Sequence, residues 1–162
     1  MSWFERNAST GALTYGGVVK DGTNGVDGLN QPYFVTLSSD AKHAYVSGYT
    51  DDALSWYDRN STTGALTYGG MLKDGTNGVD GLNGASVVAL SPDGKFAYVT
   101  GYADNTVSMF TRDPLTGALS YGSASDANYT LTAEDLGSVI TVVASYTDGG
   151  TFEHNVSSGG TA

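Results

Sequence analysis

Aspartate and asparagine side chains gather in two nearly identical glycine-rich segments, residues 21–30 and 74–83. Carboxylate and amide oxygens on such loops suit Ca²⁺, which takes about six to eight oxygen ligands. The candidate calcium ligands are Asp21, Asn24, Asp27, Asp74, Asn77 and Asp80 in these segments, together with Asp51 and Asp104 in turns that we expect on the same rim of the fold. Their spacing fails the EF-hand pattern, and Asn-Gly and Asp-Gly pairs form tight turns without a metal. A structural role is therefore favoured over calcium binding, and no other cofactor is predicted.

The sequence offers little for covalent or acid–base catalysis, and no catalytic residue is predicted. Cysteine is absent, and the two histidines, His43 and His154, are expected inside strands. The Gly-x-Ser-x-Gly nucleophile pattern, the phosphate-binding loop and the dinucleotide fingerprint are all missing.

The charge balance narrows the range of partners. The 162 residues hold 7 Lys+Arg and 17 Asp+Glu, a net charge of −10, which disfavours binding to nucleic acid. The longest apolar run, near residues 139–144, is far shorter than the ~20 residues of a membrane helix, so no membrane span is expected. No signal peptide follows Met1. Frequent glycine and few charges indicate short strands and tight turns, and an extracellular or cell-surface location in a bacterium is expected.

A repeat organises the first two thirds of the chain. Residues 2–54 align without a gap on residues 55–107, with 34 identical positions of 53, and a partial third copy covers residues 108–122. Within one period, alternating apolar residues predict strands at residues 86–90, 96–102, 106–112 and 118–121. Each period is therefore expected to form a four-stranded antiparallel meander, which is the unit of a β-propeller blade.

Several strings in the repeat carry a family resemblance. Residues 90–100 (LSPDGKFAYVT), 104–110 (DNTVSMF), 116–119 (TGAL) and 74–82 (DGTNGVDGL) resemble the YVTN-repeat, lactonase-like β-propellers. The first copy departs from the motif at residues 38–42 (SSDAK), which lack Pro and Gly. The resemblance implies a ring of about seven blades and hydrolysis of a sugar lactone, as in 6-phosphogluconolactonase.

The strand count predicts an incomplete propeller. About two and a half blades are expected in residues 1–122, while even small propellers use ~4 blades. We therefore expect a piece of a larger protein, whose exposed blade faces and edges associate with further copies or with the missing blades of a parent protein.

Residues 123–162 read as a different module. The 53-residue repeat does not continue into these residues. Their pattern predicts a strand at 128–132, a long strand at 138–146, a turn at 147–150 and a return strand at 151–157. Residues 128–158 resemble the last strands of immunoglobulin-like repeats in bacterial adhesins, which implies a partial immunoglobulin-like β-hairpin module followed by a linker.

The fold class expected from these patterns is all-β. The favoured function is a non-catalytic extracellular or cell-surface binding or structural module. A lactonase-like hydrolase is the first alternative, and a truncated product without independent function is the second. Fold resemblance alone is a weak reason to assign an activity.

Overall fold

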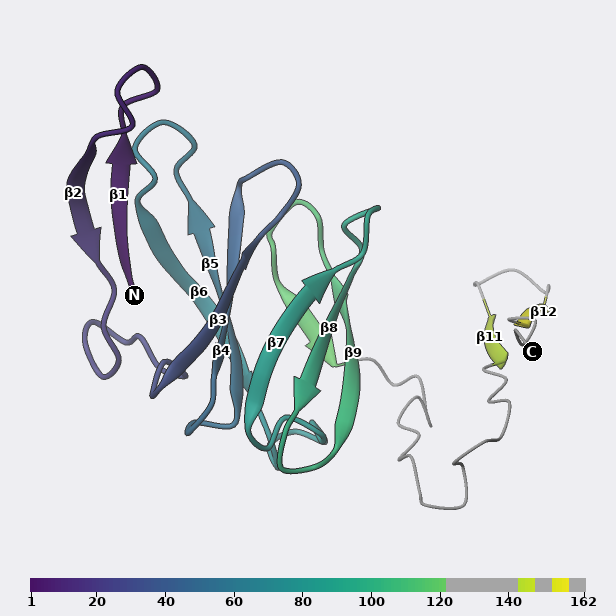
Figure 1. The fold of residues 1–162 in the computed structure, drawn as a ribbon. Coiled ribbons are helices and arrows are strands. Elements are labelled where there is room, and N and C mark those ends of the chain that lie inside the picture. The colour runs from purple at the N-terminus through teal and green to yellow at the C-terminus, as the bar shows by residue number, and fades with distance from the viewer. Residues whose placement is uncertain (122–142, 148–152, 158–162) are drawn as a thin grey trace.

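The computed structural model describes residues 1–121, 143–147 and 153–157, and these form β-strands joined by turns, without a helix (Figure 1). None of the described residues forms a helix long and apolar enough to cross a membrane. The all-β prediction is therefore confirmed. The strands fall into four antiparallel sheets.

Two of the sheets have four strands in chain order, as the repeat predicts. Sheet II contains β3 (Pro32–Leu37), β4 (His43–Gly48), β5 (Ala53–Arg59) and β6 (Leu66–Lys73). Sheet III contains β7 (Ala85–Leu90), β8 (Phe96–Gly101), β9 (Thr106–Arg112) and β10 (Leu119–Tyr121). Each sheet is a meander of consecutive antiparallel strands, the form of a propeller blade.

Sheet I has two strands, β1 (Ser2–Arg6) and β2 (Leu13–Val18), and matches the outer half of a blade. Its register repeats that of β5 and β6, because Trp3 lies opposite Gly17 as Trp56 lies opposite Gly70, with a register shift after each tryptophan. In Figure 1 the three sheets follow one another in the order I, II, III. The prediction of two blades and half of another is confirmed.

Paired glycines make room for the tryptophans. A Cβ atom at Gly69 or Gly70 would come within 2.6 Å of the Trp56 indole, so the ring can lie across the neighbouring strand only where side chains are absent. The Tyr-Gly-Gly string of each full copy therefore has a packing role.

Among the described residues, the core consists of two clusters, and the smaller repeats part of the larger. One cluster packs sheet II against sheet III and includes Leu54, Val79, Leu82, Val99 and Phe110. The other packs the β2–β3 connection, with Met1 and Val19 beside sheet I, against the opposite face of sheet II. Each of its buried members lies 53 residues before a member of the first: Val26, Leu29, Ala44, Val46 and Tyr57. The sequence repeat is thus a repeat of packing between adjacent sheets.

The hairpin predicted near the C-terminus is present in part. Strands β11 (Val143–Thr147) and β12 (Glu153–Ser157) pair antiparallel, with Val143 opposite Ser157. The predicted strand at residues 128–132, the turn at 147–150 beyond Thr147 and the linker lie outside the described residues.

Candidate functional site

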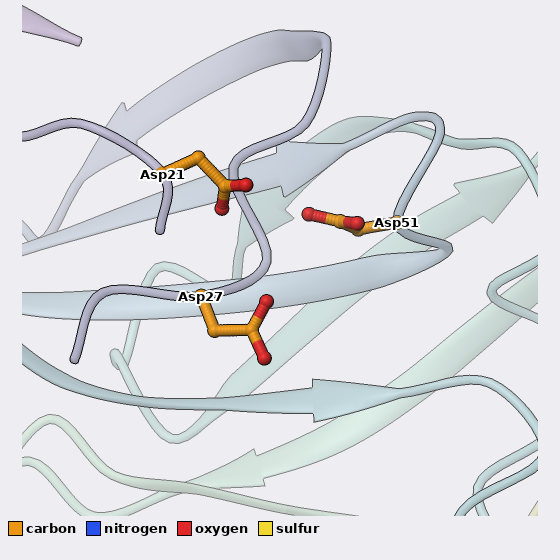
Figure 2. Close-up of side chains that lie close together, drawn as sticks. All are labelled: Asp21, Asp27 and Asp51. Atoms are coloured by element: carbon orange, nitrogen blue, oxygen red, sulfur yellow. The ribbon is translucent and has the colours of Figure 1, made fainter. Parts of the chain in front are cut away.

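The predicted ligands come together on one rim of the stacked sheets. The connection from β2 to β3 carries Asp21 and Asp27, and the turn from β4 to β5 carries Asp51. Figure 2 shows the three side chains directed toward a common space, and one carboxylate oxygen of each lies within 4.8 Å of the others. Asp51 is half-buried and Asp27 is exposed.

Each carboxylate in this cluster also accepts a hydrogen bond from the backbone. The N–H groups of the consecutive residues 28, 29 and 30 donate to Asp27 Oδ1 at 2.9 Å, to Asp21 Oδ1 at 3.0 Å and to Asp51 Oδ2 at 2.8 Å. The cluster therefore fixes the strand entry into sheet II by satisfying three amides that no strand partner reaches. The second oxygen of each carboxylate has no hydrogen-bond partner among the described residues.

The second copy of the cluster has the same geometry. Asp74, Asp80 and Asp104 bring one oxygen each within 4.8 Å of the others. They accept from the N–H groups of residues 82, 81 and 83 at 2.9, 3.0 and 3.0 Å. Two acidic clusters, each spanning an inter-sheet connection and a hairpin turn, therefore lie at equivalent places on the rim.

The two asparagines of the predicted set have a backbone role. Asn24 and Asn77 both have φ of 52°, in the left-handed region, and each precedes a glycine with φ of 78°. This is the Asn-Gly turn that the sequence indicates, and it explains both residues without a ligand. Calcium binding at the six carboxylates stays a prediction.

A buried polar network between sheets II and III was not foreseen from the sequence. Arg112 donates from Nη2 to His43 Nδ1 at 2.8 Å, from Nε to the Tyr45 hydroxyl and from Nη1 to the carbonyl of Gly94 at 2.7 Å. The Tyr45 hydroxyl donates in turn to the carbonyl of Gly117 at 2.9 Å. Arg112 therefore donates hydrogen bonds to both sheet II and sheet III.

His43 is held as a neutral imidazole in this network. A guanidinium can only donate, so Nδ1 is the acceptor and the ring proton is on Nε2, which lies 3.6 Å from Asp58 Oδ1. Burial lowers the pKa of His43, and the positive charge of Arg112 lowers it further. The expectation of an ordinary strand histidine missed this role, although Arg6, Arg59 and Arg112 recur at intervals of 53 residues.

The carboxylate clusters can do two kinds of chemistry. A carboxylate with a free oxygen can accept a proton from water, which is the task of a general base. Several carboxylates at this separation can also coordinate a hard cation through oxygen. Both uses leave the backbone hydrogen bonds in place.

Solved structures with similar folds include a gluconolactonase and a putative 6-phosphogluconolactonase. The chain is similar to the periplasmic gluconolactonase of Pseudomonas aeruginosa, at 26% identity and a TM-score of 0.51, over 59% of this chain and 26% of that one. A Lactobacillus plantarum protein matches at 26% identity and a TM-score of 0.58, over 74% and 33% of the two chains. A putative 6-phosphogluconolactonase of Bacteroides fragilis NCTC 9343 matches at 23% identity and a TM-score of 0.59, over 79% and 33%.

The chain spans roughly a quarter to a third of the length of these structures. No curated protein sequence matches it significantly. None of the comparisons supports the immunoglobulin-like resemblance of residues 128–158, and a family match over residues 35–132 overlaps the start of that segment.

The model of one protein family matches residues 35–132, which include both four-stranded sheets almost entirely. The repeated meanders, their stacking and this match agree, and the chain belongs to the lactonase, 7-bladed beta-propeller family.

Proposed function

We propose that this protein acts in the hydrolysis of a sugar lactone, with its sheets supplying part of the rim of a lactonase propeller. The family match over residues 35–132 carries the proposal. The similarity to the Pseudomonas aeruginosa gluconolactonase supports it, because that protein's name specifies a lactone as its substrate. The non-catalytic surface role favoured by the sequence receives no such support.

The chemistry required is simple. Water attacks the carbonyl carbon of the ring ester, a base takes the proton from that water, and the ring oxygen leaves as a hydroxyl after protonation. The free oxygens of Asp21, Asp27 and Asp51, or of their equivalents in the second cluster, are the bases that this chain offers.

The charge of the rim favours a neutral substrate. Six carboxylates in two clusters, on a chain of net charge −10, repel a phosphate group. We therefore propose an uncharged lactone such as glucono-1,5-lactone in preference to its 6-phosphate ester. The extracellular or cell-surface location expected from composition stays a prediction.

A pH-stat assay with both lactones tests this function, with the spontaneous hydrolysis of each lactone as the blank. The wild-type protein should accelerate hydrolysis of the neutral lactone more than that of the phosphate ester. Replacing all six aspartates of the two clusters with Asn should reduce the rate about 100-fold or more, because an amide cannot accept the proton, while its oxygen can still accept the backbone hydrogen bond.

Glu5→Gln is the matched control, because it removes a carboxylate from an exposed strand residue outside both clusters. Its rate should equal that of the wild type. An equal loss of rate in Glu5→Gln, or a wild-type rate no greater than the blank, would count against the proposal.

A further inference from the structure

Sheets I and III lie at opposite ends of the stack (Figure 1). Each has a face on which large apolar side chains are exposed. The tail face lies on sheet III and contains Tyr98 and Val107. The head face lies on sheet I and contains Phe4, Leu13 and Tyr15, with Arg6 beside them. Large apolar side chains gathered on a sheet face indicate a surface that packs against a partner.

The repeat identifies what each face would contact. Tyr45 and Leu54 of sheet II are 0% exposed because sheet III covers them. Their equivalents 53 residues later are Tyr98 and Val107, which are 39% and 58% exposed. The tail face is therefore a second copy of a surface that is already buried elsewhere in the same chain.

The head face corresponds to the other side of that buried interface. Phe110, Arg112, Leu119 and Tyr121 of sheet III face sheet II, where Phe110 and Leu119 are buried. The residues 106 positions earlier are, in the same order, Phe4, Arg6, Leu13 and Tyr15. All four of these residues are exposed.

The head and tail faces also carry the groups that make the polar contacts at the boundary of sheets II and III. At the boundary of sheets II and III, Tyr45 receives a hydrogen bond from Arg112 and donates one to the carbonyl of Gly117. Gly117 belongs to a turn closed by its N–H to the carbonyl of Asp113 at 2.8 Å, with φ of 69°. The turn on sheet I is the same, since Gly11 donates to the carbonyl of Asn7 at 2.9 Å with φ of 75°.

We propose that a second copy of this chain docks its head face on the tail face of the first, and so repeats the packing of sheet III on sheet II. Tyr98 of one copy then donates to the carbonyl of Gly11 of the next and accepts from Arg6. The guanidinium of Arg6 stacks on Phe96, which stands where His43 lies in the internal interface.

A second copy is the occupant favoured by the residues themselves. The head face carries the same types as the surface that covers Tyr45: an aromatic ring for Phe110, an arginine for Arg112 and a leucine for Leu119. Such a contact is heterologous, because the two faces differ, and it adds copies in one direction into a ring or a filament. The proposal does not depend on lactonase activity.

Equilibrium sedimentation of the full chain over a range of concentrations tests the proposal. The wild type should show masses above that of one chain, rising with concentration. Arg6→Glu, which alters only the head face, and Val107→Glu, which alters only the tail face, should each weaken association about tenfold or more. Both residues are exposed, so circular dichroism should report an unchanged fold.

Mixing the two variants gives the sharpest result. One variant keeps an intact tail face and the other an intact head face, so the mixture should form dimers and nothing larger. Leu115→Ser is the matched control, because Leu115 is an exposed apolar residue of a turn outside both faces, and it should associate as the wild type does.

A second readout uses the absence of cysteine from the chain. Equal amounts of Arg6→Cys and Tyr98→Cys protein should form a disulfide-linked dimer faster than either variant alone. A wild type that is monomeric at every concentration would overturn the proposal and leave a further blade of a longer chain as the occupant. Association unchanged by both glutamate substitutions would also overturn it.

Discussion

At the scale of single residues, the repeat shows which positions the backbone demands. The turn between β3 and β4 lacks the Pro and Gly of its counterpart between β7 and β8, yet it keeps the same hydrogen bonds. The hydroxyl of Ser38 donates to Asp40 Oδ1 at 2.6 Å and the N–H of Lys42 donates to the same oxygen at 3.1 Å. To form this turn, Ala41 adopts a left-handed φ of 57°, whereas the equivalent residue of the second copy is Gly94, with φ of 70°.

Exchanging these two residues should change stability in opposite directions. Ala41→Gly should raise the free energy of unfolding by about 1 kcal/mol, because glycine adopts this φ without a Cβ clash. Gly94→Ala should lower it by at least as much, since its Cβ would also lie 3.3 Å from Arg112 Nη1. Urea denaturation measures both. Destabilisation by Ala41→Gly would contradict the φ argument.

The aspartates of the rim illustrate a role that exists without a ligand. Asp51→Ala should lower the free energy of unfolding by about 1–2 kcal/mol, because the N–H of residue 30 loses its acceptor. Asp51→Asn should cost less, since its amide oxygen can still accept. Thermal unfolding compares them. If Ca²⁺ raises the melting temperature of the wild type but not of Asp51→Asn, the cluster is a calcium site as well as a backbone anchor.

At the scale of elements, the contact between sheets II and III combines an apolar core with one buried arginine. Arg59 is the equivalent arginine of sheet II, and it donates to the carbonyl of Ala41 at 3.0 Å within its own sheet. Arg112 makes the equivalent bond to Gly94 and adds contacts to residues 67 and 69 positions earlier in the chain. Those added contacts join the two sheets and fix how they pack.

This network makes stability depend on pH. The folded protein holds the pKa of His43 below its ordinary value of 6.5, through burial and Arg112, whereas Asp40 and Asp58 oppose the shift and Lys42 adds to it. The unfolded chain therefore binds a proton at His43 more readily than the folded chain does. The resulting stabilisation is complete above about pH 6.5 and is lost as the pH falls below that value.

The melting temperature should accordingly fall between pH 7 and pH 5, and His43→Phe should flatten this dependence. Phenylalanine is the matched choice because Phe96 holds the equivalent place in sheet III. Differential scanning calorimetry at several pH values provides the measurement. An equally steep dependence in His43→Phe would show that other groups cause it.

At the scale of the whole molecule, the repeat predicted most of the fold and part of the site. The alternation within residues 86–112 located β7, β8 and β9 within a residue of their ends, because each strand has one buried face. The acidic clusters were foreseen because a connection and a turn of each blade share a rim. The pairing of His43 with Arg112 was not, since no local pattern relates residues 69 positions apart.

The same repeat explains why burial differs between equivalent residues. Val88 is 2% exposed under the covering side chains of sheet II, while Val35, its equivalent in sheet II, is 51% exposed. Equivalent positions of the repeat therefore form equivalent strands, and the neighbouring sheet decides which of their side chains are buried. An activity built on several blades depends on these contacts in the same way.

The most direct test of the central claim is a lactone assay on each fraction of a gel-filtration run of the purified protein. We predict that hydrolysis of glucono-1,5-lactone above the blank elutes with the protein and scales with its amount in each fraction. Protein-containing fractions that hydrolyse the lactone no faster than buffer would contradict the assignment of lactonase function to this chain.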